Sequence, residues 1–425
     1  MTQHTSHATP DVGSARRLTQ PTNGRRRERL LVVGGGMAAL KLVEELVEQC
    51  PGRYEIVVAA KEQHAPYNRV LLSSLLAGEA QAADVELRPA AWYGEKGVLL
   101  LSGVEASGLR PARQEVILST GARLGYDRLV LATGSKAIRL PVPGHLLPGV
   151  LTFRDVNDVS VLQRALPGSR AVVIGGGLLG VEAACGLAKR GLAVTLIHIM
   201  PRLMERQLDA RAAELLKAAI ESKGVEVVLE AHTAVIEGDG KAERVVLKDG
   251  RAFPANLVVM AAGIRPETAL AESGGIEISR GIKVDDKLET NWPGVYAIGE
   301  CAEHRGTCYG IVEPVYEQAR ALARYLSGRP ARYEGSLMAT SLKVSGVPVY
   351  SMGDFEGEGA EAIIFEDEGA GSYRKLVVRN NRLAGVVLFG DTGDAFWYRD
   401  LIRQSTPLAG IRALLAFGRA HAEAA

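Results

Sequence analysis

Two short stretches decide the fold of this chain: "VVIGGGLLG" at residues 172–180 and "LLVVGGGMAA" at residues 30–39. In each, the apolar, β-branched residues of a buried strand run directly into three glycines. A helical pattern follows the earlier stretch, and the strand-like "YEIVVAA" comes after it. The same order returns in "RAVVIGGG", "LLGVEAACGLAKRG" and "LAVTLIHI". The sequence therefore predicts two βαβ units, each with a glycine turn between its first strand and its helix.

The first unit has the glycine spacing of a dinucleotide-binding turn. Gly34, Gly36 and Ala39 follow the G-x-G-x-x-G/A pattern. The first glycine makes the tight turn, the second lets a pyrophosphate approach the backbone, and the small third residue lets helix and strand pack closely. The helix N-terminus then offers unpaired N–H groups to the phosphates. Glu62, just past the second strand, is the carboxylate expected to face a ribose hydroxyl pair.

The second unit has the full spacing but lacks the expected acid. Its glycines are Gly175, Gly177 and Gly180, and Glu182 follows two residues later in the helix. His198 stands where a carboxylate should end the second strand, and Arg206 follows in "PRLMERQLD". An acid there favours NADH, whereas neutral or cationic residues tolerate the extra phosphate of NADPH. His198 could equally be a surface residue that caps the strand, so the choice between NADH and NADPH stays open.

Bulk composition excludes several classes of protein. The 425 residues carry a net charge of +1, which gives no basic field to bind nucleic acid or anionic lipid. No run of 18 or more apolar residues is present, so we expect no membrane span. Four irregularly spaced cysteines fit a reducing compartment, and we expect a cytoplasmic protein without a metal site.

The chain is long enough for several domains. We expect a disordered, arginine-containing tail at 1–28, a first dinucleotide fold at 29–150, a second at 151–268, a return to the first at 269–332, and a mixed α+β interface domain at 333–425. The fold class is thus α/β, with two Rossmann-like domains and a smaller C-terminal one. In that last part, Asn380 and Asn381 predict a hairpin. A helical stripe of Phe396, Trp397 and Leu401 would suit a core or a homodimer contact.

The order of further motifs resembles a known family. After the first glycine turn come "LVLATGS" with Ala132, Thr133 and Gly134, the second turn, "AAGIRP" with Gly263 and Arg265, and "GVYAIGE" with Gly299 and Glu300. This order, over about 29–330, resembles the FAD-dependent pyridine nucleotide-disulfide oxidoreductase superfamily. Within it, "PYNRVLLSSLLAGE", "LMERQLD" and "IGECAEHRG" are similar to the flavoprotein portion of assimilatory NAD(P)H nitrite reductases and to electron-transfer subunits of nitrate assimilation.

The resemblance implies FAD in the first fold and NADH or NADPH in the second. Gly34, Gly36 and Glu62 would then meet the FAD pyrophosphate and adenosine ribose, and Tyr67, Asn68 and Arg69 would approach the flavin. Gly299 and Glu300 would close that site, with Glu300 where most of the superfamily has Asp. Catalysis would need no protein nucleophile, and Arg69, Arg265 and Glu300 would place the rings and tune their charge.

Departures from the wider superfamily limit where electrons can go. Residues 37–60 contain only Cys50, so the Cys-x4-Cys pair of disulfide reductases is missing, and Ser73 and Ser74 occupy the region of the peroxidase cysteine. The cysteines are too few to ligate an iron–sulfur cluster, and Cys301 and Cys308 fit no metal pattern. We therefore expect a separate acceptor, an iron–sulfur, siroheme or molybdenum reductase component.

Two alternatives stay open. One is an NADH-dependent ferredoxin or rubredoxin reductase, although "LLSSLL" lacks the lysine that such relatives usually carry near the flavin. The other is a redox-sensing flavoprotein of the apoptosis-inducing-factor type, in which bound nucleotide controls association more than turnover.

Overall fold

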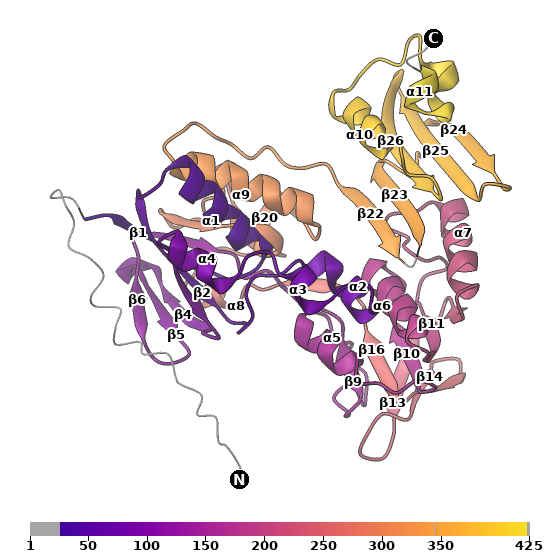
Figure 1. The fold of residues 1–425 in the computed structure, drawn as a ribbon, viewed down its shortest axis with the longest axis horizontal. Helices are drawn as coiled ribbons and strands as arrows, with labels where there is room; N and C mark the ends of the chain where they lie inside the picture. Colours follow the sequence, from indigo (N-terminus) through magenta and orange to yellow (C-terminus); the bar gives the residue numbers. More distant parts are fainter. Residues whose placement is uncertain (1–25, 345, 423–425) are drawn as a thin grey trace.

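The computed structural model describes residues 26–344 and 346–422 (Figure 1), so most of the tail predicted at 1–28 lies outside the described residues. The first sheet is parallel, in the order β19 (Val295–Ala297), β7 (Arg128–Leu131), β1 (Glu28–Val33), β2 (Tyr54–Ala60) and β3 (Leu99–Ser102). Helices α1 (Met37–Gln49) and α9 (Val312–Leu326) share one hydrophobic cluster on this sheet. Strand β19 and helix α9 come from the part of the chain that follows the second glycine turn. This agrees with the return to the first fold that we expect from the sequence.

The second sheet repeats this arrangement. Its parallel order is β12 (Val225–Val228), β11 (Ala193–Ile197), β10 (Arg170–Ile174), β16 (Leu257–Met260) and β9 (Val150–Thr152). Helices α5 (Val156–Leu162), α6 (Leu178–Lys189) and α7 (Ala210–Glu221) pack on it. In the first fold Val33 pairs with Ala59 and Leu131, and in the second Ile174 pairs with Ile197 and Met260. The predicted duplication of the βαβ unit is confirmed.

Two short segments connect the folds near the ends of their central strands. β8 (Ser135–Ala137) follows β7, β17 (Ile264–Pro266) follows β16, and the two pair antiparallel with Lys136 opposite Arg265. Helix α2 (Leu72–Leu76) of the first fold packs against α6 of the second within one cluster of buried side chains. β8 and β17 extend beyond the carboxyl ends of β7 and β16, and because both sheets are parallel, each glycine turn lies at that same edge of its own sheet.

The C-terminal region is an antiparallel sheet that lies over the second fold (Figure 1). Its order is β22 (Ala339–Val344), β23 (Val347–Gly353), β26 (Arg382–Phe389), β25 (Ser372–Arg379) and β24 (Glu361–Asp367). Along β26, Val387 and Phe389 face the second fold, while Val386 and Leu388 face a separate cluster with helix α10 (Ala395–Arg403). The sheet is thus sandwiched between its own helix and the dinucleotide fold.

Two sequence predictions for this region have different outcomes. The hairpin is confirmed, because Arg379 pairs with Arg382 and both Asn380 and Asn381 have positive φ, as a two-residue turn requires. The apolar stripe on α10 is only partly buried. Leu401 is buried, but Phe396 is 68% exposed and lies beside Arg399. Phe396 is therefore not part of the core, and the alternative of a homodimer contact stays a prediction.

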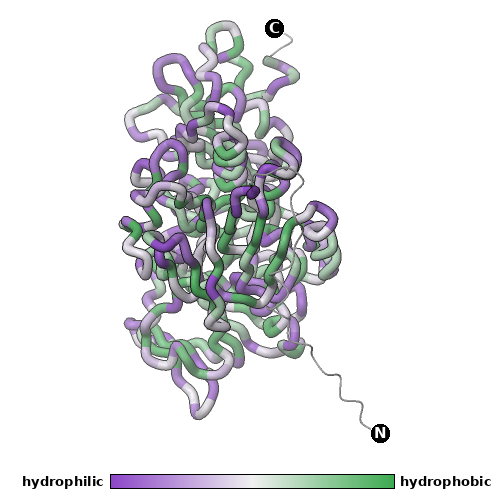
Figure 2. The backbone as a smooth tube through the Cα atoms, turned by 90° about the vertical axis from the view of Figure 1, so that its left-hand side faces the viewer, coloured by the Kyte–Doolittle hydropathy of each residue, from purple (hydrophilic) through white to green (hydrophobic). Residues whose placement is uncertain are grey.

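Smaller elements complete the structure. Three-stranded sheets are formed by β4 (Ala106–Arg110), β5 (Glu115–Leu118) and β6 (Arg123–Gly125); by β13 (Thr233–Glu237), β14 (Arg244–Leu247) and β15 (Ala252–Pro254); and by β18 (Ile282–Val284), β20 (Ala302–His304) and β21 (Thr307–Cys308). Short helices are α3 (Ala82–Val85), α4 (Ala90–Glu95), α8 (Ala269–Ser273) and α11 (Arg419–Ala422). Hydrophobic segments gather toward the middle of the molecule, while hydrophilic segments are common in the loops at its edges (Figure 2). Within the described ranges, the helices are too short or too polar to cross a bilayer.

The domain boundaries at 150, 268 and 332 stay predictions. They are supported by the strands just described, because β9 begins at Val150 in the second sheet and β19 returns to the first.

Asp209 joins the second fold to the C-terminal sheet. It is buried, caps α7 by accepting from the N–H of Ala212, and accepts from the Tyr373 hydroxyl at 2.7 Å. Lys375 lies 3.5 Å away. Because the cap, the hydroxyl and the ammonium all lose their partner together, D209A should lower the free energy of unfolding by about 3 kcal/mol. D209N keeps the helix cap and should lower the free energy of unfolding by only about 1 kcal/mol. Chemical denaturation of D209A and D209N measures this difference in stability, and equal losses would contradict the role of the cap.

Candidate functional site

The first glycine turn requires glycine for two different reasons. Gly34 has φ of +121°, and a Cβ there would lie 2.1 Å from the carbonyl oxygen of Ala132, so the chain itself demands glycine. Gly36 has ordinary extended backbone, and no described atom beyond its neighbours lies within 4 Å of where its Cβ would be. Polypeptide packing therefore leaves space at Gly36, immediately before the first turn of α1.

The second turn repeats this geometry. Gly175 has φ of +122°, and its Cβ would lie 2.3 Å from the carbonyl oxygen of Ala261. Gly177 again has extended backbone, with no described atom beyond its chain neighbours within 4 Å of a Cβ position. A Cβ on Gly180 would lie 1.8 Å from the carbonyl oxygen of Gly175, so only glycine fits there. The equivalent position of the first fold is the buried Ala39. The two turns are structural equivalents.

Both helices that follow the turns begin without a competing partner for their N–H groups. Within the described residues, neither α1 nor α6 has a side-chain cap, and neither first turn contains an acid. An uncapped helix N-terminus behind an open backbone position is suited to an anionic phosphate. The residues present therefore fit a pyrophosphate at each turn.

A network of charged side chains lies between the folds. Glu62 is ion-paired with Arg69 and accepts from the Tyr67 hydroxyl at 2.7 Å, while Arg69 donates to the carbonyl of Arg154 at 3.0 Å. The Arg154 guanidinium is in turn ion-paired with Glu300. Four residues predicted for the FAD site, Glu62, Tyr67, Arg69 and Glu300, are thus brought together. Glu62 points toward Tyr67 and Arg69, and its contact with a ribose stays a prediction.

Arg154 and Ser135 belong to this network but were missed from the sequence. Ser135 Oγ donates to Glu300 at 2.8 Å and accepts from Arg154 at the same distance. The backbone N–H of Arg154 donates to Asp158, which fixes the chain where β9 leads into α5. The one available signal was an arginine directly before the helix cap Asp155, and that pattern does not identify a site.

Gly299 and Glu300 are placed beside the first turn by a sequence-distant contact. Gly299 has φ of +85°, and its N–H donates to the buried amide oxygen of Gln318 at 2.7 Å. A Cβ on Gly299 would lie 3.0 Å from that of Ala38 in α1. Cys301, the next residue but one, is buried, and its thiol pKa is raised by burial. That thiol donates to main-chain carbonyls, which is consistent with a structural role.

The other predicted residues lie near the paired strands β8 and β17, called here the β8–β17 ribbon, and in the loop before α2. Thr133 Oγ1 donates to the carbonyl of Glu267 at 2.6 Å, and Gly134 has φ of +69°. Asn68 accepts from the N–H of Val70 and caps a short 3-10 turn. Gly263 and Arg265 are exposed, outside the Glu62–Arg69–Arg154–Glu300 network.

The alternative that His198 lies at the surface is wrong, because its residue is only 7% exposed. Its ring is turned inward, with Nδ1 3.0 Å from the N–H of Gly176 and Nε2 3.0 Å from Glu205. When the two folds are compared by strand register, His198 is the equivalent of Ala60, and Met200 is the equivalent of Glu62. The second fold therefore has an exposed methionine where the first has its carboxylate. Arg206 is 86% exposed nearby.

Glu182 lies on α6, toward α2 of the first fold, with Ser73 as a hydrogen-bond partner. Burial raises the pKa of its carboxyl from 4.5 to about 7. The folded protein therefore keeps this proton up to about pH 7, whereas the unfolded chain releases it near pH 4.5. Its contribution to the free energy of unfolding should fall as pH rises through this window, by about 3 kcal/mol in all.

E182Q should lack this component of the pH dependence. Denaturation from about pH 5 to about pH 8 should show the variant gaining stability relative to the native protein as pH rises. Parallel curves for the two proteins would show that Glu182 does not hold the proton.

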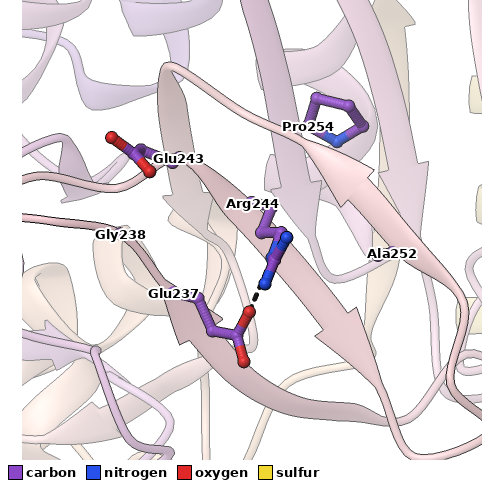
Figure 3. Close-up of a pocket in the computed structure, with 6 residues that line it drawn as sticks. All are labelled: Glu237, Gly238, Glu243, Arg244, Ala252 and Pro254. Carbon is purple, nitrogen blue, oxygen red and sulfur yellow. Dashed lines mark hydrogen bonds and ion pairs between the residues drawn. The ribbon is translucent and has the colours of Figure 1, made fainter.

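A hollow elsewhere in the second fold contains none of the predicted residues. It lies on the β13–β14–β15 sheet and is lined by Glu237, Gly238, Glu243, Arg244, Ala252 and Pro254, with Glu237 paired to Arg244 (Figure 3). Since neither glycine turn reaches it, it is not part of the site.

Two equivalent glycine turns whose residues fit a pyrophosphate, one in each of two joined Rossmann-like folds, are typical of a flavin- and pyridine-nucleotide-dependent oxidoreductase. The chain belongs to the pyridine nucleotide-disulphide oxidoreductase family, whose model matches residues 28–322. Its cofactors are FAD and NAD(P)H. A second family model, the C-terminal domain of rubredoxin NAD+ reductase, matches residues 339–406.

Relatives agree with this family. The chain is 44% identical over 371 residues to nitrite reductase [NAD(P)H] of Bacillus subtilis, covering 87% of this chain and 46% of that protein. It is also 44% identical to the assimilatory nitrate reductase electron transfer subunit of the same organism, covering 87% and 48%. The chain thus spans about half the length of these relatives.

Shorter relatives are matched over most of their length. Identity is 31% to the ferredoxin–NAD(+) reductase subunit of the benzene 1,2-dioxygenase system of Pseudomonas putida, covering 84% of this chain and 88% of that one. Among solved structures, a ferredoxin reductase from Rhodopseudomonas palustris superposes with a TM-score of 0.83 at 26% identity, over 90% of this chain and 96% of that one.

Proposed function

We propose that this chain is a reductase component that takes hydride from NADH or NADPH onto FAD and passes the electrons to a separate protein. The acceptor we propose is an iron–sulfur, siroheme or molybdenum component of nitrate or nitrite assimilation. The observation that carries the proposal is the pair of equivalent glycine turns held together by the β8–β17 ribbon. Similarity to the Bacillus subtilis electron transfer subunit supports the class of acceptor.

We assign the site residues as follows. FAD would be bound by Gly34, Gly36, Ala39, Glu62, Tyr67, Asn68, Arg69, Ala132, Thr133, Gly134, Gly299 and Glu300. NAD(P)H would be bound by Gly175, Gly177, Gly180, Glu182, His198, Arg206 and Gly263. Of the second set, His198 would act from behind the turn, since both of its ring nitrogens contact protein groups.

The chain's own residues would align the two cofactors and set the local charge. FAD, when bound, accepts a hydride and can return electrons singly or in pairs. Two ion pairs, Glu62–Arg69 and Arg154–Glu300, form a set with no net charge, which would hold these side chains rigid beside a ring. Arg265, exposed on β17, would place positive charge near the nucleotide.

A second candidate is a ferredoxin or rubredoxin reductase. The rubredoxin reductase C-terminal match at 339–406 and the dioxygenase reductase relatives favour it. It differs from the first only in the acceptor. A cytoplasmic location belongs to both proposals, because the cysteine spacing suits a reducing compartment.

Rapid mixing of the NAD(P)H-reduced protein with each class of acceptor tests the proposal. We expect reoxidation to be fastest with a siroheme nitrite reductase or a molybdenum nitrate reductase. Faster reoxidation by a [2Fe–2S] ferredoxin or a rubredoxin would replace the first candidate by the second. Slow flavin reduction with a long-lived charge-transfer complex would instead indicate a redox sensor.

A further inference from the structure

A buried imidazole holds the second glycine turn from behind. The Nδ1 atom of His198 lies 3.0 Å from the main-chain N–H of Gly176. A peptide N–H can only donate, so Nδ1 is the acceptor and the ring proton is on Nε2. That nitrogen donates to the carboxylate of Glu205 at 3.0 Å. The carboxylate therefore selects the tautomer that can accept from the turn.

The chain that follows His198 contacts Gly176 a second time, at its carbonyl group. The N–H of Met204 donates to the carbonyl of Gly176 at 2.9 Å. Met204 is fully buried and has φ of +50°, a conformation that is strained for a residue with a side chain. A Cβ on Gly176 would lie 2.6 Å from both the His198 ring and Leu203. The segment from His198 to Met204 thus holds both polar groups of this peptide residue.

Among the residues that the structure describes, no side chain gives the first glycine turn this support. Its equivalent residue is Gly35, whose Cβ position lies 2.5 Å from the methyl group of Ala60. That methyl group fills the place of the imidazole and accepts no hydrogen bond. The two turns match in backbone geometry but differ in what holds their middle glycine.

We propose that His198 is a positioning residue that keeps the NAD(P)H turn ordered when no nucleotide is bound. This rests on the proposed function, in which FAD stays bound while NAD(P)H enters and leaves at every turnover. An exchanging ligand must otherwise order the turn each time it binds, and that cost weakens its affinity. The hydrogen bond from Gly176 to His198 removes the free-energy cost of ordering the turn. A permanently bound cofactor can instead order its own turn once and keep it ordered.

A pair of variants of similar shape isolates the hydrogen bond. In His198→Asn an amide oxygen takes the place of Nδ1 and can accept from the N–H of Gly176. In His198→Leu the side chain branches at the same atom but offers no acceptor. In the flavin-loaded protein, H198L should raise the Kd of NAD+, measured by calorimetry, about tenfold. H198N should stay within about threefold of the native value. In H198L the loss should fall on KM rather than on kcat, and the flavin content should be unchanged.

Glu205 provides an independent test at a less buried position. E205Q keeps an acceptor for Nε2–H and should bind NAD+ like the native protein, whereas E205A frees the ring and should raise the Kd about threefold. Equal affinities of H198L and H198N would overturn the inference, and so would loss of flavin from H198L alone. If the native protein binds neither NAD+ nor NADP+, the proposed function itself is wrong.

Discussion

Replacing Gly36 by valine is expected to give a folded protein that contains no flavin. The backbone at Gly36 is extended, with φ of −84° and ψ of −170°, which suits a β-branched residue. No described atom beyond its chain neighbours lies within 4 Å of its Cβ position, so the fold should tolerate the side chain. A valine would instead fill the space where the FAD pyrophosphate must approach the backbone, and affinity for FAD should fall by roughly 100-fold or more. Visible absorbance of the purified protein measures the effect.

Gly34 is the matched control for this variant. G34A should fail to fold normally, because its Cβ would overlap the carbonyl oxygen of Ala132. Two neighbouring glycines should thus give two different defects, one in stability and one in cofactor content. A G36V protein that remains yellow, with native flavin content, would show that the first turn does not hold the FAD pyrophosphate.

Replacing Gly177 by valine is expected to leave the flavin in place and abolish its reduction at ordinary NAD(P)H concentrations. Gly177 has the same extended backbone and the same open Cβ position as Gly36, but at the start of α6. The fall in kcat/KM should be roughly 100-fold, because the nucleotide pyrophosphate loses its approach to the backbone. Stopped-flow reduction at increasing nucleotide concentration separates weaker binding from slower hydride transfer.

Chemical reduction by dithionite supplies the control for G177V. The flavin of this variant should bleach with dithionite as in the native protein, which would place the defect in nucleotide binding. If NADH or NADPH reduced G177V at the native rate, the second turn could not be the nucleotide site.

Much of the fold could be predicted because its signals are local. Each βαβ unit is specified by a buried strand, a glycine turn with fixed spacing and a helix within about 30 residues, and φ values near +120° at Gly34 and Gly175 show why glycine is needed. The hairpin at Asn380 and Asn381 is equally local, since both residues tolerate positive φ.

The rest depends on contacts between distant parts of the chain. Arg154 meets Glu300 across 146 positions, and no spacing rule connects an arginine after one strand to an acid in another fold. The direction of His198 also could not be predicted, because the chain leaves its sheet after Ile197 and the alternation of side chains ends there. Phe396 shows a third limit, since helical periodicity defines a stripe but not which of its members is covered.

The central claim is that one chain binds FAD at the first glycine turn and NAD(P)H at the second, close enough for hydride to pass between them. Anaerobic titration of the flavin-loaded protein with NADH and with NADPH tests it most directly. The account predicts that the visible absorbance of the oxidised flavin disappears on addition of about one equivalent of at least one nucleotide per flavin. An absorbance that persists in excess of both nucleotides, while dithionite removes it, would contradict the account.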